Sequence, residues 1–175
     1  MESPLIMGYR SPRVMVVAEF LDLLPQLLGT LFVDERCLIA VAEFDDGRYV
    51  QFWAEGGTSL VAEVIANQGS RGSQVLSVAD ENCLSAQGWG PPGLLGPNWR
   101  YEARDVTQVI DCVALVRHAV RSVLHRCEAE SMSLRTWSMV RDVSVDGVVA
   151  REQGRNAYRR SLEELRRLID CDGAT

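Results

Sequence analysis

The chain has 175 residues, of which 47% are hydrophobic and 24% charged, so its length and composition fit a single globular domain spanning residues 1–175. Its formal net charge of −6 argues against general nucleic-acid binding, which relies on clustered cations, and all 18 basic residues are Arg scattered along the chain. No apolar run approaches the roughly 20 residues that a membrane-spanning helix needs, and the N-terminus lacks an export signal, so we expect a cytoplasmic protein.

The first predicted element is a helix that begins at Ser11-Pro12, where a hydroxyl cap precedes a proline at the first helical position. Apolar residues then recur at helical spacing and form one buried stripe: Val14, Val17, Ala18, Leu21, Leu24 and Leu28. Pro25 must kink or end this helix, because proline removes a backbone donor and crowds the preceding turn. We expect a main helical segment to about Leu24, either with or without a short continuation after it.

Three strands are predicted next, at Cys37 to Phe44, Arg48 to Ala54 and Ser59 to Ala66. The connections between them are short and carry turn residues, with Asp45-Asp46-Gly47 in the first and Glu55-Gly56-Gly57 in the second. Parallel strands would need long crossovers, so these strands must form an antiparallel meander.

The second strand carries apolar residues on both of its faces. Alternation places Tyr49 and Trp53 on one face and Phe52 on the other. A sheet of this kind needs either two covers, or a helix on one face and a partner on the other. Trp53 is then either core or the floor of a peptide groove, because aromatic residues dominate cores and interfaces alike. The surfaces around Tyr49, Phe52 and Trp53 are therefore the candidate protein-binding surface.

A loop at Asn67 to Gln74 leads to the capping-box pattern Ser77-Val78-Ala79-Asp80, which predicts a short helix that Gly88 terminates. Several prolines exclude a regular helix or a central strand in the segment that follows. Its two tryptophans are best explained as a structural loop clamp rather than a ligand platform. The predicted clamp residues are Gly88, Trp89, Pro91, Asn98 and Trp99.

Asp105 is the predicted cap of a long helix that reaches to about Arg126. Its apolar face comprises Val106, Val109, Ile110, Val113, Val116, Val120, Val123 and Leu124. One or two strands with a turn at Asp146-Gly147 are expected within Ser131 to Val149, and a last helix from about Arg151 to Ile169.

Several local motifs carry a family resemblance: Tyr49-Val50-Gln51-Phe52, Ala62-Glu63-Val64, Gly88-Trp89 followed by Pro91-Pro92, and Pro97-Asn98-Trp99. With these motifs the chain resembles, from about Val14 to Arg126, the peptide-binding chaperone-like family that groups type III secretion chaperones with YbjN-like proteins, in particular its actinobacterial members. The resemblance implies an α+β fold in which an antiparallel meander packs with helices. Residues 11–126 would form a family-like part with the order α-β-β-β-α-α.

The chain also departs from this family. Those chaperones place further strands between their second and last helices, whereas Trp99 to Asp105 leaves room for almost nothing. Residues 127–175, which have no counterpart in the resemblance, are expected to form a C-terminal extension with a terminal helix.

What the resemblance implies for function is a non-catalytic protein- or peptide-binding chaperone-like module with a role related to secretion. It also implies a homodimer or a heterotypic complex in which the sheet and helices offer apolar surface to a protein segment. The alternative is a regulatory or scaffold subunit that packs against one folded partner.

No catalytic or cofactor-binding constellation is expected. The two histidines, His118 and His125, would lie about 10 Å apart along a helix axis, which is too far for both to hold one metal ion. Ser122 lies near both, but no nucleophile elbow surrounds it. The five Cys form neither a metal-binding pattern nor a disulfide framework, so reduced, mostly buried thiols are expected. The sequence therefore predicts a protein that is not an enzyme and has neither metal nor cofactor.

Overall fold

The computed structural model describes residues 6–9, 12–33, 37–55, 58–67, 76–93 and 96–140. Its elements, in chain order, are β1 (Ile6–Tyr9), β2 (Arg13–Val16), α1 (Val17–Val33), β3 (Cys37–Phe44), β4 (Tyr49–Glu55), β5 (Ser59–Val64), α2 (Val78–Ala86), β6 (Trp99–Ala103), α3 (Val106–His118), the π-helical turn η2 (Ala119–Val123) and β7 (Ser131–Val140). The predicted last helix, the turn at Asp146-Gly147 and nearly all of the predicted loop from Asn67 lie outside the described residues.

The seven strands form one antiparallel sheet, in which β7, β3, β4, β5 and β6 lie side by side in that order. β1 and β2 pair with opposite ends of β7, since Ile6–Tyr9 faces residues 137–140 and Arg13–Val16 faces residues 131–134. Together they form one interrupted edge strand. The predicted meander of β3, β4 and β5 is confirmed, as is the α+β class with helices packed on an antiparallel sheet.

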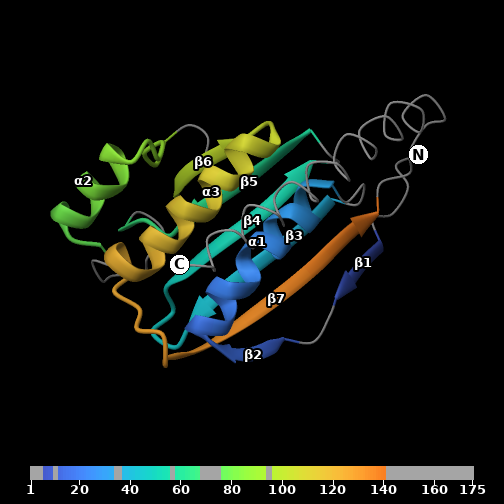
Figure 1. Cartoon of the computed structure of the whole chain (residues 1–175), viewed down its shortest axis with the longest axis horizontal. Helices are drawn as coiled ribbons and strands as arrows, with labels where there is room; N and C mark the ends of the chain where they lie inside the picture. The colour runs from blue at the N-terminus through green and yellow to red at the C-terminus, as the bar shows by residue number, and fades with distance from the viewer. Residues whose placement is uncertain are drawn as a thin grey trace, which may run out of the picture.

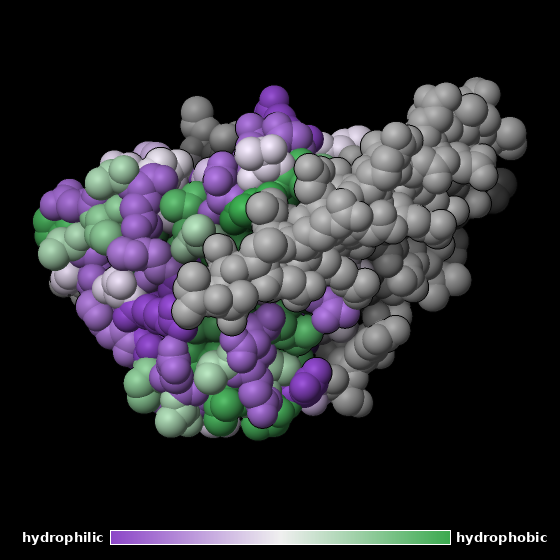
Figure 2. Space-filling model, viewed as in Figure 1, coloured by the Kyte–Doolittle hydropathy of each residue, from purple (hydrophilic) through white to green (hydrophobic). Residues whose placement is uncertain are grey.

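Helices α1 and α3 pack against each other and cover one face of the sheet, while α2 lies beyond the β6 side and contacts η2 (Figure 1). The core between these layers contains Phe20, Leu24 and Leu28 of α1, all fully buried, together with Phe52 of β4 and Val116 of α3. Seen from the helix side, the described surface is hydrophilic over much of its area (Figure 2). None of the helices in the described ranges is long and apolar enough to cross a bilayer.

The predicted start of the first helix is wrong, because residues Arg13–Val16 form strand β2 and the helix begins at Val17. Val14 is 72% exposed and does not belong to the buried stripe. The first N–H groups of α1, at Val17 and Ala18, donate to the carbonyl oxygens of Glu130 and Glu128 at 2.9 and 3.0 Å. Segments more than 100 residues away in sequence therefore decide where this helix begins.

Helix α1 also continues through Pro25 to Val33, so of the two alternatives left open after Leu24 the continuation is the one observed. Proline inside a helix costs about 3 kcal/mol. The stripe of buried residues continues after the proline with Leu28, Leu31 and Phe32. Burial of these side chains outweighs the local cost, since each fully buried Leu or Phe contributes about 2 kcal/mol.

The expected order of α-β-β-β-α-α is wrong, because the structure contains two further strands, β6 and β7. Trp99–Ala103, where almost no room was expected, forms β6 at the edge of the sheet, in register with β5. Ser131–Val140, which falls in the predicted extension, forms β7 and is an inner strand between β3 and the β1/β2 edge. The strand expected within Ser131 to Val149 is thus confirmed in its first part, and it contributes to the central sheet.

The predicted caps of α2 and α3 are confirmed. Ser77 and Asp80 form the predicted capping box at the start of α2, and the Asp105 side chain accepts a hydrogen bond from the Gln108 N–H at 2.9 Å. The helix after Asp105 does not reach Arg126 in regular form, because it changes to the π-helical turn η2 at Ala119 and ends before Leu124. His125 follows with a positive φ of 53°, which turns the chain toward β7.

Candidate functional site

The face of the sheet opposite α1 and α3 carries the alternate side chains of every inner strand. Antiparallel partners in register share a face, so Ile39, Trp53 and Val61 lie together, as do Val41, Gln51, Glu63 and Arg100. We call this surface, which also includes Tyr49, the open face. In the described part of the chain, both helices that cover the sheet lie on its other side (Figure 1).

Trp53 lies at the centre of the open face. Its side chain is half-buried, with Ile39 and Val61 in register on the two neighbouring strands. The guanidinium carbon of Arg100 lies 5.3 Å from the centroid of the Trp53 ring. A cation–π contact of this kind contributes about 0.5–1 kcal/mol at an exposed site. Arg100 therefore holds the indole ring of Trp53 in place, and the neighbours in register, Ile39 and Val61, are apolar.

A buried polar cluster lies next to Trp53 on the same face. Glu63 and Asn98 are each only 3% exposed. The Glu63 Oε2 atom accepts hydrogen bonds from Gln51 Nε2 at 2.6 Å and Asn98 Nδ2 at 3.0 Å. Asn98 also bonds the Tyr49 hydroxyl at 3.1 Å. A polar network that satisfies its members fixes their positions, so this cluster joins the loop before β6 to β4 and β5.

The three residues of the predicted protein-binding surface do not all lie together. Tyr49 and Trp53 share the open face, as alternation along β4 requires. Phe52 is fully buried on the helix-covered face, where it forms part of the core. Phe52 is therefore corrected from a surface residue to a core residue.

The predicted clamp segment joins the end of α2 to the start of β6. Gly88 has a positive φ of 87°, and the Trp89 N–H donates to the Leu84 carbonyl at 3.1 Å. Trp89 and Trp99 are 2% and 6% exposed, and the Trp89 ring meets the Tyr101 ring edge-on at a centroid distance of 6.1 Å. Pro91, in contrast, is exposed. The two indoles thus pack into the domain on either side of an exposed turn.

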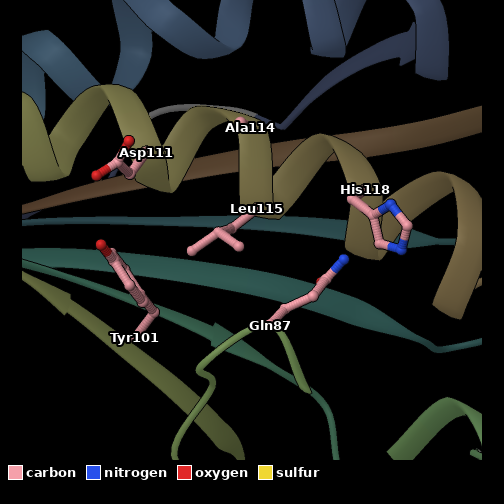
Figure 3. A pocket seen from close by; sticks show the side chains of 6 residues that line it. All are labelled: Gln87, Tyr101, Asp111, Ala114, Leu115 and His118. Atoms are coloured by element: carbon pink, nitrogen blue, oxygen red, sulfur yellow. The ribbon is translucent and has the colours of Figure 1, made fainter. Parts of the chain in front are cut away.

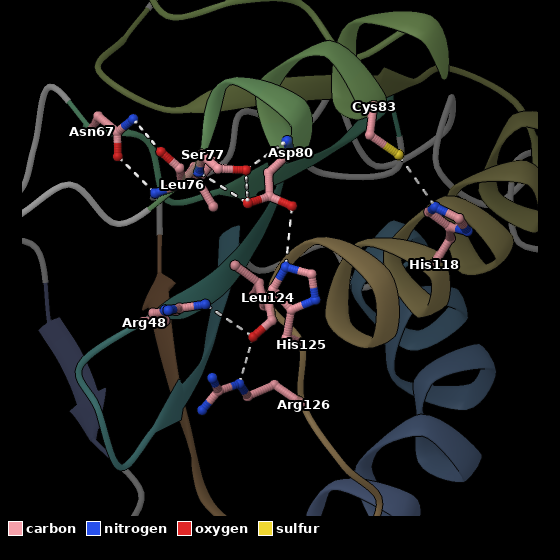
Figure 4. A network of polar contacts seen from close by, with 10 residues as sticks. All are labelled: Arg48, Asn67, Leu76, Ser77, Asp80, Cys83, His118, Leu124, His125 and Arg126. Carbon is pink, nitrogen blue, oxygen red and sulfur yellow. Dashed lines mark hydrogen bonds and ion pairs between the residues drawn. The ribbon is translucent and has the colours of Figure 1, made fainter.

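Both histidines contact α2, and neither contact involves Ser122 (Figure 4). His118 Nε2 lies 3.5 Å from the Cys83 Sγ atom, and His125 Nε2 lies 3.1 Å from Asp80 Oδ1. Burial pushes the pKa of the Asp80 carboxyl upward, but the hydrogen bonds from Ser77 and the nearby His125 outweigh it and hold this pKa below its ordinary value. These pairs join α2 to the end of α3.

The described thiols occupy three different environments. Cys112 is buried, Cys83 is half-buried and Cys127 is exposed, so the expectation of mostly buried thiols does not hold for them. Burial, followed by the negative charge of Asp111, raises the pKa of the Cys112 thiol to about 12. A thiol with such a pKa stays protonated at neutral pH and is a poor nucleophile. Within the described ranges, no group of three or more His, Cys, Asp or Glu residues is placed to hold a metal ion.

Two features of the open face were not predicted from the sequence. The Arg100–Trp53 contact depends on β6, which was not expected, and the link from Asn98 to Glu63 and Tyr49 depends on how the loop folds back. Strand alternation does carry one signal, because it places the charged Glu63 on the same side of the meander as Gln51.

Comparison with known families places the chain in one of them. The model of the family described as TY-Chap3, "T3SS (YopN, CesT) and YbjN peptide-binding chaperone 3", matches residues 18–138, which is more than half of the chain. This range runs from the second residue of α1 to the eighth residue of β7 and includes the open face. No curated protein and no solved structure matches the chain.

Proposed function

The chain belongs to the TY-Chap3 family of peptide-binding chaperones, and from this premise we propose that it is a non-catalytic module that holds an extended, apolar segment of a partner protein against its open face. The observation that carries the proposal is the half-buried Trp53 between apolar neighbours on a sheet face that none of the described helices covers. The same face of β4 also carries Tyr49, so two amphipathic aromatic side chains are available to a partner.

The residues of the open face define the chemistry of the segment. An apolar strip crosses the three inner strands β3, β4 and β5 at Ile39, Trp53 and Val61. The half-buried Ile39 and Trp53 are accessible to a partner, whereas Val61 is only 2% exposed and supports Trp53 from below. Charged pairs flank it, with Arg135 and Glu43 in contact at 2.7 Å on one side and Arg100 beside Glu102 at 3.7 Å on the other. A matching segment has an apolar centre and polar or charged flanks.

The width of the sheet gives the length of this segment. From β7 to β6 the face spans four strand spacings of about 4.8 Å, or about 19 Å, and extended chain rises about 3.3 Å per residue. A segment of about six residues therefore crosses the face from one charged border to the other. The buried Glu63–Asn98 cluster supports the proposal because it holds the surface in one conformation before the segment arrives.

Substitution of the central tryptophan tests this proposal. We expect Trp53→Ala to weaken binding of a fluorescein-labelled, carboxymethylated protein that cannot refold by about thirtyfold, which is the typical loss at an interface hot spot. Fluorescence anisotropy measures the affinity, and circular dichroism verifies that the variant is folded. Val78→Ala is the matched control, because Val78 is a 66% exposed apolar residue on α2, away from the open face.

Equal affinity of wild type and Trp53→Ala would contradict binding at the open face. Failure of the wild type to bind any unfolded chain, combined with a stable one-to-one complex with a folded protein, would favour the regulatory or scaffold subunit instead. The role in secretion and the homodimer implied by the family resemblance stay predictions, and sedimentation velocity of the purified chain tests the dimer.

A further inference from the structure

A groove of about 460 Å³ lies between α3 and the edge strand β6, on the side of the sheet opposite the open face (Figure 3). Its lining residues are Gln87, Tyr101, Asp111, Ala114, Leu115 and His118. Tyr101 is in register with Ala62 and Phe52, which places its ring on the helix-covered face. The groove is therefore separate from the surface proposed to bind apolar segments.

One end of the groove is negatively charged. The Tyr101 hydroxyl points toward α3 at the end where Asp111 lies (Figure 3). Burial raises the pKa of the Tyr101 phenol, and the negative charges of Asp111 and Asp105 raise it further, so the phenol remains a neutral hydrogen-bonding group. Among the described residues, no Arg or His forms an ion pair with Asp111. Within the described ranges its charge is thus not neutralised by an ion pair, and it can meet a cation.

The remaining walls are apolar or aromatic. Ala114 and Leu115 of α3 lie between Asp111 and His118, and the Leu115 side chain points toward Tyr101 across the groove (Figure 3). A carboxylate beside an aromatic ring and an aliphatic wall matches guanidinium better than ammonium. The guanidinium group is planar, weakly hydrated, stacks on aromatic rings and donates two hydrogen bonds to one carboxylate.

We propose that this groove binds an arginine side chain of a protein partner, independently of what the open face binds. The partner is an extended chain segment because the groove adjoins the outer edge of β6, which Gly90 pairs at Arg100 but no other described backbone pairs at Glu102. The N–H and C=O groups of Arg100 point away from β5 and bond the backbone of Gly90 at 2.9 and 2.7 Å. Because alternate residues of a strand point their backbone groups to the same side, the N–H and C=O groups of Glu102 also point away from β5. A segment passing this edge can pair with Glu102 while its arginine enters beside Tyr101. The net charge of −6 favours a basic segment.

An NMR titration with blocked amino acids tests the charge requirement. N-acetyl-arginine amide is the probe, and N-acetyl-citrulline amide is its uncharged isostere. We expect the arginine probe to shift resonances of Tyr101, Asp111 and His118 in a saturable manner, and the citrulline probe to cause no such shifts at equal concentration. Equal shifts from both probes, or shifts that do not include these residues, would overturn the proposal.

A pair of charge-neutralising variants tests the site. Asp111→Asn should weaken binding of the arginine probe about fivefold, as expected for loss of one partly exposed ion pair of about 1 kcal/mol. Asp22→Asn removes the same charge from an exposed position on α1 and should leave the affinity unchanged. Equal loss in both variants would show a general charge effect and overturn the site. Tighter binding of free arginine than of the blocked probe would assign the groove to a small molecule and overturn the choice of a protein segment.

Discussion

The Asp80 side chain makes several hydrogen bonds at the start of α2. Its Oδ2 atom accepts from the Ser77 N–H at 2.9 Å and from the Ser77 hydroxyl at 2.6 Å, while Oδ1 meets His125 Nε2 at 3.1 Å. The Ser77 hydroxyl in turn accepts from the Asp80 N–H. The contacts to the two carboxylate oxygens favour the ionised form, which is why the pKa of Asp80 is lowered despite burial.

Asp80→Asn should therefore destabilise the protein in a pH-dependent way. A folded-state pKa below the unfolded value contributes stability above the unfolded pKa, and this stability is lost as the pH falls through the folded pKa. At pH 7 we expect the variant to lose about 1 kcal/mol, which is typical of a broken helix cap. The difference should shrink as the pH falls below about 4, the ordinary Asp pKa.

Urea unfolding of both proteins at pH 7 and pH 3 measures this difference. Asp22→Asn, at an exposed position on α1, is the control, and its effect should be small and nearly independent of pH. An Asp80→Asn difference that is the same at both pH values would mean that the carboxylate contributes nothing through its charge.

At the scale of elements, the turn between α2 and β6 sets where the edge strand begins. Gly88 ends α2 with a left-handed backbone, and Gly90 then pairs with Arg100 in both directions, so the chain passes along the outer edge of β6 before it enters that strand. Trp89 and Trp99 are buried on either side of this turn. The groove and the Arg100–Trp53 contact both depend on the resulting position of β6.

Gly88→Ala should destabilise the protein by about 1–2 kcal/mol, because a non-glycine residue with positive φ carries that penalty. No atom lies within 4 Å of the position that a Cβ would occupy at Gly88, so the backbone alone causes the loss. Gly88→Asn should cost less, since Asn adopts the left-handed conformation more readily. Thermal unfolding distinguishes the two variants, and an equal loss in both would point to a side-chain clash instead.

At the scale of the whole molecule, strand β7 closes the sheet. It lies between β3, which begins at Cys37, and the β1/β2 edge at the N-terminus, and it begins next to the start of α1. Met132 and Leu134 contribute buried side chains to the core. The pairing of β7 with β3 joins segments about 100 residues apart, so the core is complete only when both ends of the described chain are present.

A chain truncated after Glu130 should lose cooperative unfolding, because β3 then lacks one of its two partner strands. The carbonyl groups of Glu128 and Glu130, which accept from the first N–H groups of α1, are then no longer held in place by β7. Leu134→Ala is the milder variant and should cost about 2–4 kcal/mol, as for other buried leucines. Circular dichroism during urea unfolding measures both. A truncated chain with an unchanged transition would show that β7 is dispensable.

What the sequence by itself determined is the set of features whose signals lie within a few residues. These are the β3–β4–β5 meander with its turn at Gly47, the Ser77–Asp80 capping box, the Asp105 cap and the separation of Trp53 from Phe52 by strand alternation. Caps, turns and periodicity act through contacts between residues close in sequence, so they can be recognised without knowledge of the fold.

Only the tertiary structure decided the features that require distant partners. Residues Arg13–Val16 carry a helix-start signal but pair with β7, and β6 is a strand because β5 offers an edge to it. The open face acquires its charged border and its buried Glu63–Asn98 cluster from these strands and from the loop before β6. A β-strand gains its hydrogen bonds from another segment, whereas a helix contains its own, so the identity and place of a strand depend on contacts that no local pattern encodes.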